Sequence, residues 1–440
     1  MPSPIIAHHP SELTPDRHSE QLPSTFQGWW VVIIASLFFF YEFIQMNMFN
    51  AISQELMTAF SVNASELGIL SSFYFMANVI FLFPAGFLLD RFSTKWIILI
   101  TLAICMAGIF LLSFAHSFWI AVIARFLSGI GSAFCFLSVI RLSSRWFPPH
   151  RMALMTGVII TIAMLGGVVA QTPMTLLTQA IEWRQALVWD AALGVVIWII
   201  IFLFVQDYPE GEAHYHDAEV QSLESIGYWK SLGLAFLQFK NWLAGIYTSL
   251  VNLPLSLLGG LWGMLYLTDA HGLDKIRASE ITSMLFIGML IGSPLVGWIS
   301  DHFRLRKLPM LLGALALLFV MIWVIYNHVA SYPLLWLSFL LIGLLSSTQI
   351  ISYPYVAESS PRMITAMSVS TVNITTQAGQ GLFQPLFGFL IDWHTHDVHH
   401  GAVIYSASDF HWAMWLFPIG LIVALMAAFA LHETHCQQIE

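Results

Sequence analysis

The sequence predicts an all-α integral membrane protein with about twelve transmembrane helices, arranged as two pseudo-symmetric halves of about six helices each. Its composition excludes a soluble globular protein, because 58% of the 440 residues are hydrophobic and only 9% are charged, against roughly a quarter charged in soluble domains. The apolar residues are gathered in runs of about 20, the length that crosses a bilayer core as a helix. A charged turn also occurs twice, half a chain apart, which predicts the two halves.

Each copy of this turn places a glycine four residues before an aspartate and adds bases after it, between two apolar runs. The first copy contains Gly86, Asp90, Arg91 and Lys95, and the second contains Gly297, Asp301, Arg304 and Lys307. The glycine predicts the close approach of a neighbouring helix. The aspartate can pair with nearby bases, and the bases are expected to hold the turn on the cytosolic side.

The first half is expected at residues 28–205, after a polar, disordered tail at 1–27 without a cleavable signal sequence. Apolar runs predict its spans at 28–49, 67–89, 96–114, 118–140, 153–177 and 185–205. A loop is expected after the first span, and a basic loop, Arg141–Arg151, after the fourth.

An acidic linker at 206–239 leads to the second half, expected at 240–431 and followed by a tail at 432–440. Its apolar runs predict spans at 242–267, 281–300, 308–326, 332–351, 363–391 and 412–431.

The distribution of basic residues predicts the orientation. Of the 16 Lys and Arg residues, only Arg184, Lys275 and Arg277 fall on the side opposite the N-terminus, and Arg125 falls inside a span. Because cytosolic loops carry the excess of Lys and Arg, both termini are expected in the cytosol, and we expect a bacterial inner (cytoplasmic) membrane. The chain has only 16 Lys and Arg residues and no basic tract, so a nucleic-acid partner is not expected.

Two ionisable residues, Glu42 and Arg125, lie at similar depths inside predicted spans. Charged groups are costly there, so a functional role is the default interpretation. We expect the two to share a charged site, in which Glu42 accepts a proton or binds a substrate amine and Arg125 pairs with a carboxylate. The alternative is a structural pair that only neutralises its own charges. Gln45 lies on the same helix face as Glu42.

Polar stripes on two other predicted helices are further candidates. Tyr74 and Asn78 lie four residues apart in the second span. Amides recur along one face of the eleventh span, at Asn373, Gln377, Gln380 and Gln384. Because unpartnered amides facing lipid are prohibitive, the second stripe is expected to face a cavity or another helix.

The repeated charged turn resembles the signature loop of the major facilitator superfamily. Arg125, Gly129 and Gly131 are similar to the fourth-helix motif of its proton-coupled members. The segments 143–148, 357–361 and 383–388 are similar to those of phagosomal amino-acid and nucleoside transporters of intracellular bacteria and of lysosomal dipeptide carriers. The fifth span lacks the Gly-Pro pair of the drug-antiporter branch.

The resemblance implies a secondary transporter that moves a small polar metabolite, such as an amino acid, a peptide or an organic anion, by alternating access with proton coupling. A transporter-like solute receptor, an efflux antiporter and a metal-chelate carrier are the alternatives. No catalytic motif is present, so an enzyme is not expected. The expected partners are the solute, protons and membrane lipid, with the chain as a monomer. The His-rich segment 394–400 can bind a metal or titrate, but a solvated loop is expected, with no metal or cofactor.

Overall fold

The computed structural model describes residues 25–148, 151–209, 236–327, 331–360, 365–395, 398–399, 402–403 and 405–437. Most of the predicted N-terminal tail and of the predicted linker therefore lies outside the described residues. So do parts of the His-rich segment.

Helices make up nearly all of the described chain. The first group comprises α1 (Thr25–Asn47), α2 (Phe49–Phe60), α3 (Ala64–Arg91), α4 (Thr94–Ser113), α5 (Phe118–Trp146), α6 (Met152–Val169), α7 (Thr172–Ile181) and α8 (Trp183–Phe204). The second group comprises α11 (Phe239–Val251), a π-helix (Leu255–Trp262), α12 (Gly263–Leu265), a second π-helix (Tyr266–Ala270), α13 (Lys275–Phe303), α14 (Lys307–Tyr326), α15 (Tyr332–Ser346), a 3₁₀ turn (Ser347–Ile351), α16 (Ser352–Ser359), α17 (Thr365–His394), α18 (Ala407–Met414) and α19 (Leu416–Ala430). A small antiparallel ribbon, β1 (Val398–His399) with β2 (Ala402–Val403), follows α17.

The predicted all-α membrane fold is confirmed. Within the described residues, 10 helices are long and apolar enough to cross a membrane, and 11 if the bent pair Phe239–Val251 and Leu255–Ala270, which meet at 48°, forms one span. The remaining helix of this length is α17, with 30 residues. Its amide side chains make it less apolar than the others, as the stripe in the sequence indicates.

Two predicted loops are wrong. The segment after the first span is the helix α2, because Phe49, Ile52 and Leu56 recur at helical spacing and bury one face. It ends where Ser61 adopts a left-handed conformation, with a φ of 52°. The predicted basic loop at Arg141 remains helical as far as Trp146, the last residue of α5.

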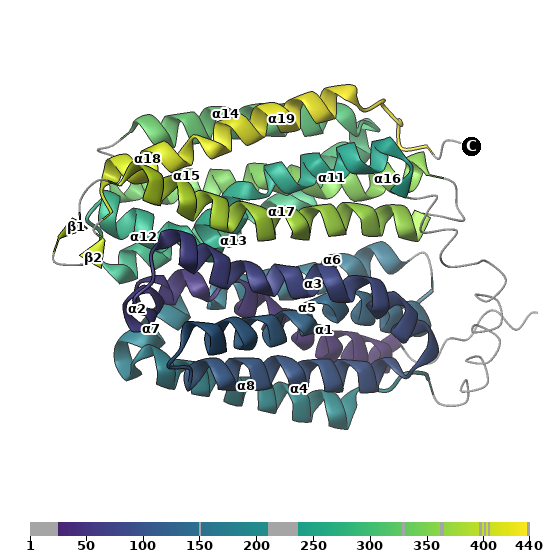
Figure 1. Ribbon diagram of the computed structural model, residues 1–440. Helices are drawn as coiled ribbons and strands as arrows, with labels where there is room; N and C mark the ends of the chain where they lie inside the picture. Colours follow the sequence, from purple (N-terminus) through teal and green to yellow (C-terminus); the bar gives the residue numbers. More distant parts are fainter. Residues whose placement is uncertain are drawn as a thin grey trace, which may run out of the picture.

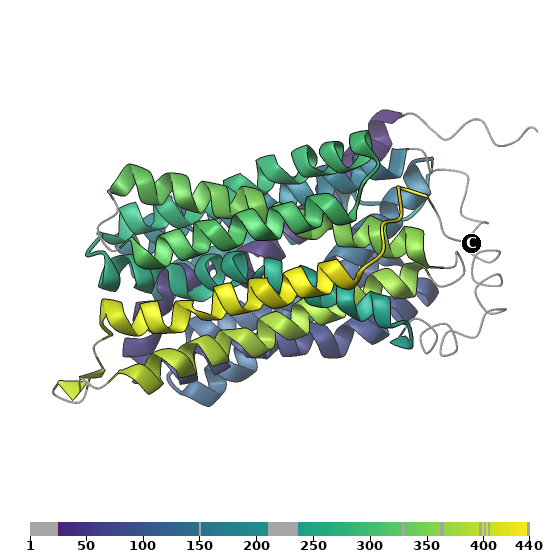
Figure 2. The same ribbon diagram turned by 90° about the horizontal axis from the view of Figure 1, so that it is seen from above.

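The helices lie roughly parallel in two groups, α1–α8 and α11–α19, with α3 beside α17 at the boundary (Figure 1). The start of α1 and the C-terminal segment lie at the same end of the bundle (Figure 2). We call this end, which also holds Val205–Pro209 and Leu305–Lys307, the linker end. The opposite end, which holds β1 and β2, is called the hairpin end.

Candidate functional site

Glu42 is buried inside the first group of helices, with 1% of its surface exposed. The Tyr74 hydroxyl of α3 donates a hydrogen bond to its carboxylate over 3.0 Å. On α5, a Cβ added to Gly131 would stand 2.1 Å from the Glu42 Oε1 atom. Only glycine at that position therefore leaves room for the carboxylate where it lies.

Arg125 of α5 is fully buried. Its Nη1 atom donates to the main-chain carbonyl of Gln45 over 2.6 Å, and its Nη2 atom to that of Met46 over 3.4 Å. The guanidinium lies over the rings of Phe49 and Tyr74, at 4.0 and 4.5 Å from their centroids. Because α1 ends at Asn47, carbonyls of its last turn lack helical partners, and a cation is favourable there. Arg125 thus caps the C-terminal end of α1.

The structure brings Glu42 and Arg125 into one cluster but does not join them directly. Their charged atoms form no ion pair, since the carboxylate binds Tyr74 and the guanidinium binds main-chain carbonyls. Tyr74 contacts both, through its hydroxyl and its ring respectively. The alternative of a structural pair that neutralises its own charges is therefore not formed, because Arg125 donates to the carbonyls at the end of α1.

Gln45 connects this cluster to a carboxylate that the sequence interpretation missed. Its amide donates to the Asp190 Oδ2 atom of α8 over 2.7 Å. Asp190 is 5% exposed. It lies in the predicted span 185–205, so the rule that singled out Glu42, an ionisable residue inside a span, also identifies Asp190.

The polar residues of α3 face inward within the first group. Tyr74 reaches Glu42, and the Asn78 amide donates to the Ser132 hydroxyl of α5. The predicted stripe of these residues thus makes interhelical hydrogen bonds.

The amide stripe of α17 lies apart from this cluster. Gln384 is buried, and its Nε2 atom lies 3.4 Å from the Ser256 carbonyl. A Cβ on Gly260 would stand 3.3 Å from that nitrogen and 3.8 Å from Asn47 Oδ1, so the stripe reaches the end of α1. Along the rest of the stripe, Asn373 and Gln377 are partly exposed and Gln380 is buried. No hydrogen bond in the described part of the chain joins the stripe to Glu42.

The first charged turn is held by a residue of the predicted linker. The Asp207 carboxylate accepts hydrogen bonds from the Ser93 hydroxyl and from the Lys95 main-chain N–H, the latter over 2.9 Å. Arg145 lies 3.7 Å from the same carboxylate, and Arg91 lies over the Phe87 ring. The side chain of Asp90 lies outside the described part of the structure.

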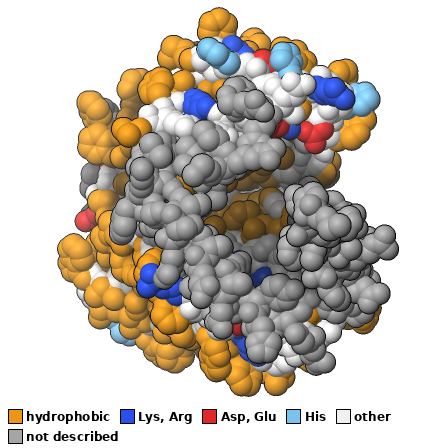
Figure 3. Space-filling model, turned by 90° about the vertical axis from the view of Figure 1, so that its right-hand side faces the viewer, with side chains coloured by type: hydrophobic (Ala, Val, Ile, Leu, Met, Phe, Trp, Pro, Cys, Tyr) orange, Lys and Arg blue, Asp and Glu red, His pale blue; other side chains and the backbone are white. Residues whose placement is uncertain are grey.

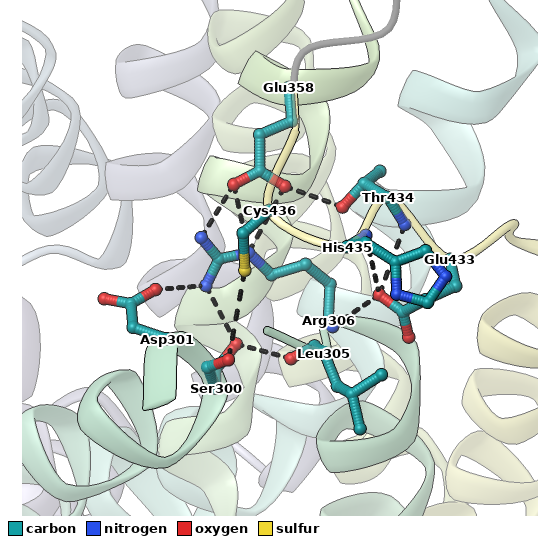
Figure 4. A network of polar contacts seen from close by, with 9 residues as sticks. All are labelled: Ser300, Asp301, Leu305, Arg306, Glu358, Glu433, Thr434, His435 and Cys436. Carbon is teal, nitrogen blue, oxygen red and sulfur yellow. Dashed lines mark hydrogen bonds and ion pairs between the residues drawn. The ribbon is translucent and has the colours of Figure 1, made fainter. Parts of the chain in front are cut away.

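In the second turn the organising base is Arg306 rather than the predicted Arg304 (Figure 4). Arg306 binds Asp301 and Glu358, both over 2.7 Å, although Asp301 is 68% exposed. Arg304 instead forms the turn itself, with a φ of 52°. Burial alone would lower the pKa of Arg306, but its hydrogen bonds to Glu358 and Asp301 raise that pKa above the ordinary value.

Gly297 does not provide the predicted close approach, because a Cβ there would meet no atom within 4 Å. The predicted Lys307 donates to the Phe429 carbonyl over 2.6 Å. Lys307 therefore binds the start of α14 to the end of α19.

The C-terminal segment caps α14. The Glu433 carboxylate accepts the main-chain N–H groups of Arg306 and Lys307, over 2.6 and 2.9 Å. The Thr434 hydroxyl donates to Glu358 over 2.6 Å (Figure 4). An acidic group at a helix N-terminus satisfies free N–H groups and the helix dipole.

We expect Glu433→Ala to lower the free energy of unfolding by about 1 kcal/mol, the usual loss for a helix cap. Glu433→Gln, which keeps an acceptor oxygen, is expected to lose less. Thermal unfolding of the purified protein in detergent, followed by tryptophan fluorescence, measures both. An alanine variant as stable as the wild type would contradict the capping role.

The two groups of helices are joined at the hairpin end. Asp392, near the end of α17, accepts the main-chain N–H of Ser65 over 2.7 Å and its hydroxyl, at the start of α3. It also accepts the Tyr405 hydroxyl over 2.8 Å, and that oxygen accepts the Ala64 N–H over 2.8 Å. We call Ala64, Ser65, Asp392 and Tyr405 the hairpin-end latch.

Other contacts between the groups lie on the same side. Glu55 and Lys275 form an ion pair at 2.5 Å, and the Met264 N–H donates to Asn50 over 2.9 Å. Gln171 donates to the Gly259 carbonyl over 2.8 Å, and the hydroxyls of Thr172 and Ser283 lie 3.0 Å apart, so several hydrogen bonds between the groups lie toward the hairpin end. Figure 3, which views the linker end, shows a hollow with hydrophobic side chains at its centre. The bundle is therefore closed at one end and hollowed at the other.

No cluster of three or more His, Cys, Asp or Glu side chains suited to a metal ion occurs in the part of the chain that the structure describes. His394 instead pairs with Asp409, with 2.7 Å between Nδ1 and Oδ1.

Comparison with known proteins places these features in a family. The model of the Major Facilitator Superfamily matches residues 34–255 and 244–436. The uncharacterized transporter YybO of Bacillus subtilis is 23% identical over 83% of this chain and 87% of its own length. The probable galactarate/D-glucarate transporter GudP of Escherichia coli is 23% identical over 86% of this chain and 89% of its own.

Solved structures show the same fold. A bacterial homolog to the human lysosomal transporter Spinster, in an inward-facing and unoccupied conformation, superposes with a TM-score of 0.73 at 17% identity, over 92% of this chain and 98% of that one. With the family model matching both groups of helices, the chain belongs to the Major Facilitator Superfamily.

Proposed function

We propose that this multi-pass membrane transporter moves a small polar metabolite by alternating access, and that Glu42 couples the movement to protons. The observation that carries the proposal is the buried cluster of Glu42, Tyr74 and Arg125 beside the break between α1 and α2. It lies in a bundle that is closed at the hairpin end and hollowed at the linker end.

The physical basis for coupling is the burial of Glu42. An ionised carboxylate inside the membrane costs several kcal/mol unless it is paired, and Arg125 is directed at the carbonyls of α1 instead. Binding and release of a proton therefore change the electrostatic energy of this cluster. Proton binding to Glu42 also changes its hydrogen bond with Tyr74, and the Tyr74 ring in turn contacts the Arg125 guanidinium.

Alternating access requires two bodies and a contact that opens. We assign the bodies to residues 28–205 and 240–431, working as a monomer. From the distribution of Lys and Arg we infer that the linker end, with both termini, faces the cytosol. In that orientation the described conformation is inward-facing, with the hairpin-end latch closed.

For the solute we favour a small organic acid, followed by amino acids and peptides. The relative GudP is named for galactarate and D-glucarate, which are polyhydroxy acids. The amides of α17 suit hydroxyl and carboxylate groups, and Arg125 in the neighbouring helix group carries a positive charge that a carboxylate could meet.

The test is uptake of labelled sugar acids, amino acids, dipeptides and nucleosides into proteoliposomes, with and without an inward proton gradient. We expect one solute class to accumulate with the gradient. Glu42→Gln is expected to lose that accumulation but to keep counterflow of the same solute, because exchange needs no net proton movement.

Glu182→Gln, the same change at an exposed position, serves as the control and should behave as wild type. If Glu42→Gln accumulates solute as the wild type does, Glu42 is not the coupling acid. Binding of a solute without counterflow would instead indicate a receptor.

A further inference from the structure

A second carboxylate, Asp190, is buried in a span and has no part in the site as proposed. It lies on the face of α8 that packs against α1. The Gln45 amide donates to it over 2.7 Å. One turn further along α8, a Cβ on Gly194 would stand 2.8 Å from the Tyr41 hydroxyl, so Tyr41 occupies the same face. That hydroxyl is buried and faces the Asp190 carboxylate.

No cation neutralises Asp190 among the described residues. The titratable groups that face it are Tyr41 on α1 and Cys105 on α4, with Glu42 beyond Tyr41. On α7 the sequence Thr172–Ile181 holds no titratable residue. On α8 itself, Arg184 is directed away, to the carbonyls of Ser113 and Ala115.

Gln45 joins Asp190 to the end of α1. Its side chain binds Asp190, while its main-chain carbonyl accepts the Arg125 guanidinium over 2.6 Å. The Gln45 Oε1 atom is buried and has no partner. Protonated Asp190 has an O–H group that can donate a hydrogen bond to this oxygen. Rotation of the amide by half a turn then replaces the bond from the Gln45 N–H to Asp190 with one from the Asp190 O–H to Gln45. The Asp190 proton and the Gln45 orientation are thereby linked.

We propose that Asp190 is a second proton-binding group of this protein, and that Gln45 transmits its protonation to the end of α1 that Arg125 caps. Its role in transport rests on the proposed proton coupling. Its ability to bind a proton does not, because the geometry around Asp190 is independent of any solute. A carboxylate buried in a span without a counter-ion is costly as an anion. A movement of α1 against α8 changes the surroundings of Asp190, and proton exchange at Asp190 is therefore coupled to that movement.

The experiment is infrared difference spectroscopy of the purified, full-length protein in lipid on a step from acidic to alkaline pH. Protonated carboxyl groups give a carbonyl stretching band that disappears on ionisation. Wild-type protein is expected to lose two buried-carboxyl components. Asp190→Asn should remove one, Glu42→Gln the other, and the double variant both, whereas Glu182→Gln should match the wild type.

Gln45→Leu tests the link between Asp190 and Gln45. Loss of the amide should shift the carbonyl frequency of the Asp190 component and leave the frequency of the Glu42 component unchanged. A wild-type spectrum in Asp190→Asn overturns the proposal, and an unshifted band in Gln45→Leu overturns the connection. Should Asp190→Asn fail to fold, Asp190→Glu keeps the carboxyl group and must show the component at a shifted frequency. Because no solute is needed, failure of the transport assay leaves this result unaffected.

Discussion

Replacing Arg125 with glutamine is expected to abolish transport and to lower the free energy of unfolding by about 3 kcal/mol, since buried carbonyls left without donors cost about 1–3 kcal/mol each. The guanidinium holds two carbonyls at the end of α1 and stacks on Phe49 and Tyr74. No shorter side chain makes all four contacts.

Arg125→Lys keeps the charge but lacks the planar fork that reaches two carbonyls at once. We therefore expect Arg125→Lys to be more stable than Arg125→Gln. Its transport is expected to be at least roughly tenfold slower than that of the wild type, a rise of about 1.4 kcal/mol in the activation free energy. Initial rates of counterflow in proteoliposomes and thermal unfolding in detergent measure the two effects.

Arg184 offers a matched control. It also donates to two main-chain carbonyls, those of Ser113 and Ala115, and lies over an aromatic ring, that of Trp183. It stands at the hairpin end of α8, away from the break in α1. Arg184→Gln is expected to destabilise the protein while sparing counterflow. If Arg125→Gln retains counterflow to the same degree, Arg125 is only a structural cap.

The sequence identifies which residues matter in the spans better than it identifies their partners. Glu42 and Arg125 stand out because ionisable residues are costly in lipid, and the structure places both in one buried cluster. The two side chains do not pair with each other, because Arg125 binds the end of α1 at Asn47, where neither proline nor glycine marks a break. The end of the helix creates the free carbonyls that Arg125 binds.

The partners of the charged residues in the loops depend on the conformation of each turn, which the amino-acid composition does not reveal. Asp301 is followed by three bases, and the left-handed turn at Arg304 decides that Arg306 faces it. Glu358 and Glu433 come from distant segments to the same place, with no local pattern to signal it. By contrast, the amide stripe of α17 follows from helical periodicity alone, because four amides on one face of a long helix require a polar environment.

The seam between α3 and α17 provides the second large prediction, because main-chain atoms of the two helices touch there. A Cβ on Gly388 would stand 2.3 Å from the Ala64 carbonyl oxygen, and one on Gly68 would stand 2.6 Å from the Pro385 Cα atom. Rotation of a side chain cannot relieve either clash. Gly388→Val is therefore expected to force the hairpin end apart, and with it the latch of Ser65 and Asp392.

Ser53 provides a reporter for this opening. It is buried on α2 near the boundary between the two groups, and its hydroxyl bonds only to the Asn50 carbonyl of its own helix. In a background in which Cys436 is serine, Ser53→Cys should react slowly with a membrane-impermeant maleimide added on the hairpin side. Adding Gly388→Val should raise that rate by roughly tenfold or more, as expected if the change favours the open state by at least about 1.4 kcal/mol.

Gly297→Val is the matched control, since a Cβ at Gly297 meets no atom within 4 Å and the residue lies toward the linker end of α13. It should leave the labelling rate unchanged. Equal labelling in the Gly388 and Gly297 variants would mean that the α3–α17 seam does not control access at the hairpin end. Faster labelling in the Gly388 variant alone, accompanied by loss of counterflow, would mean that re-forming this glycine contact is a step of each transport cycle. A seam that merely stabilised the fold would not couple access at the hairpin end to movement of solute across the membrane.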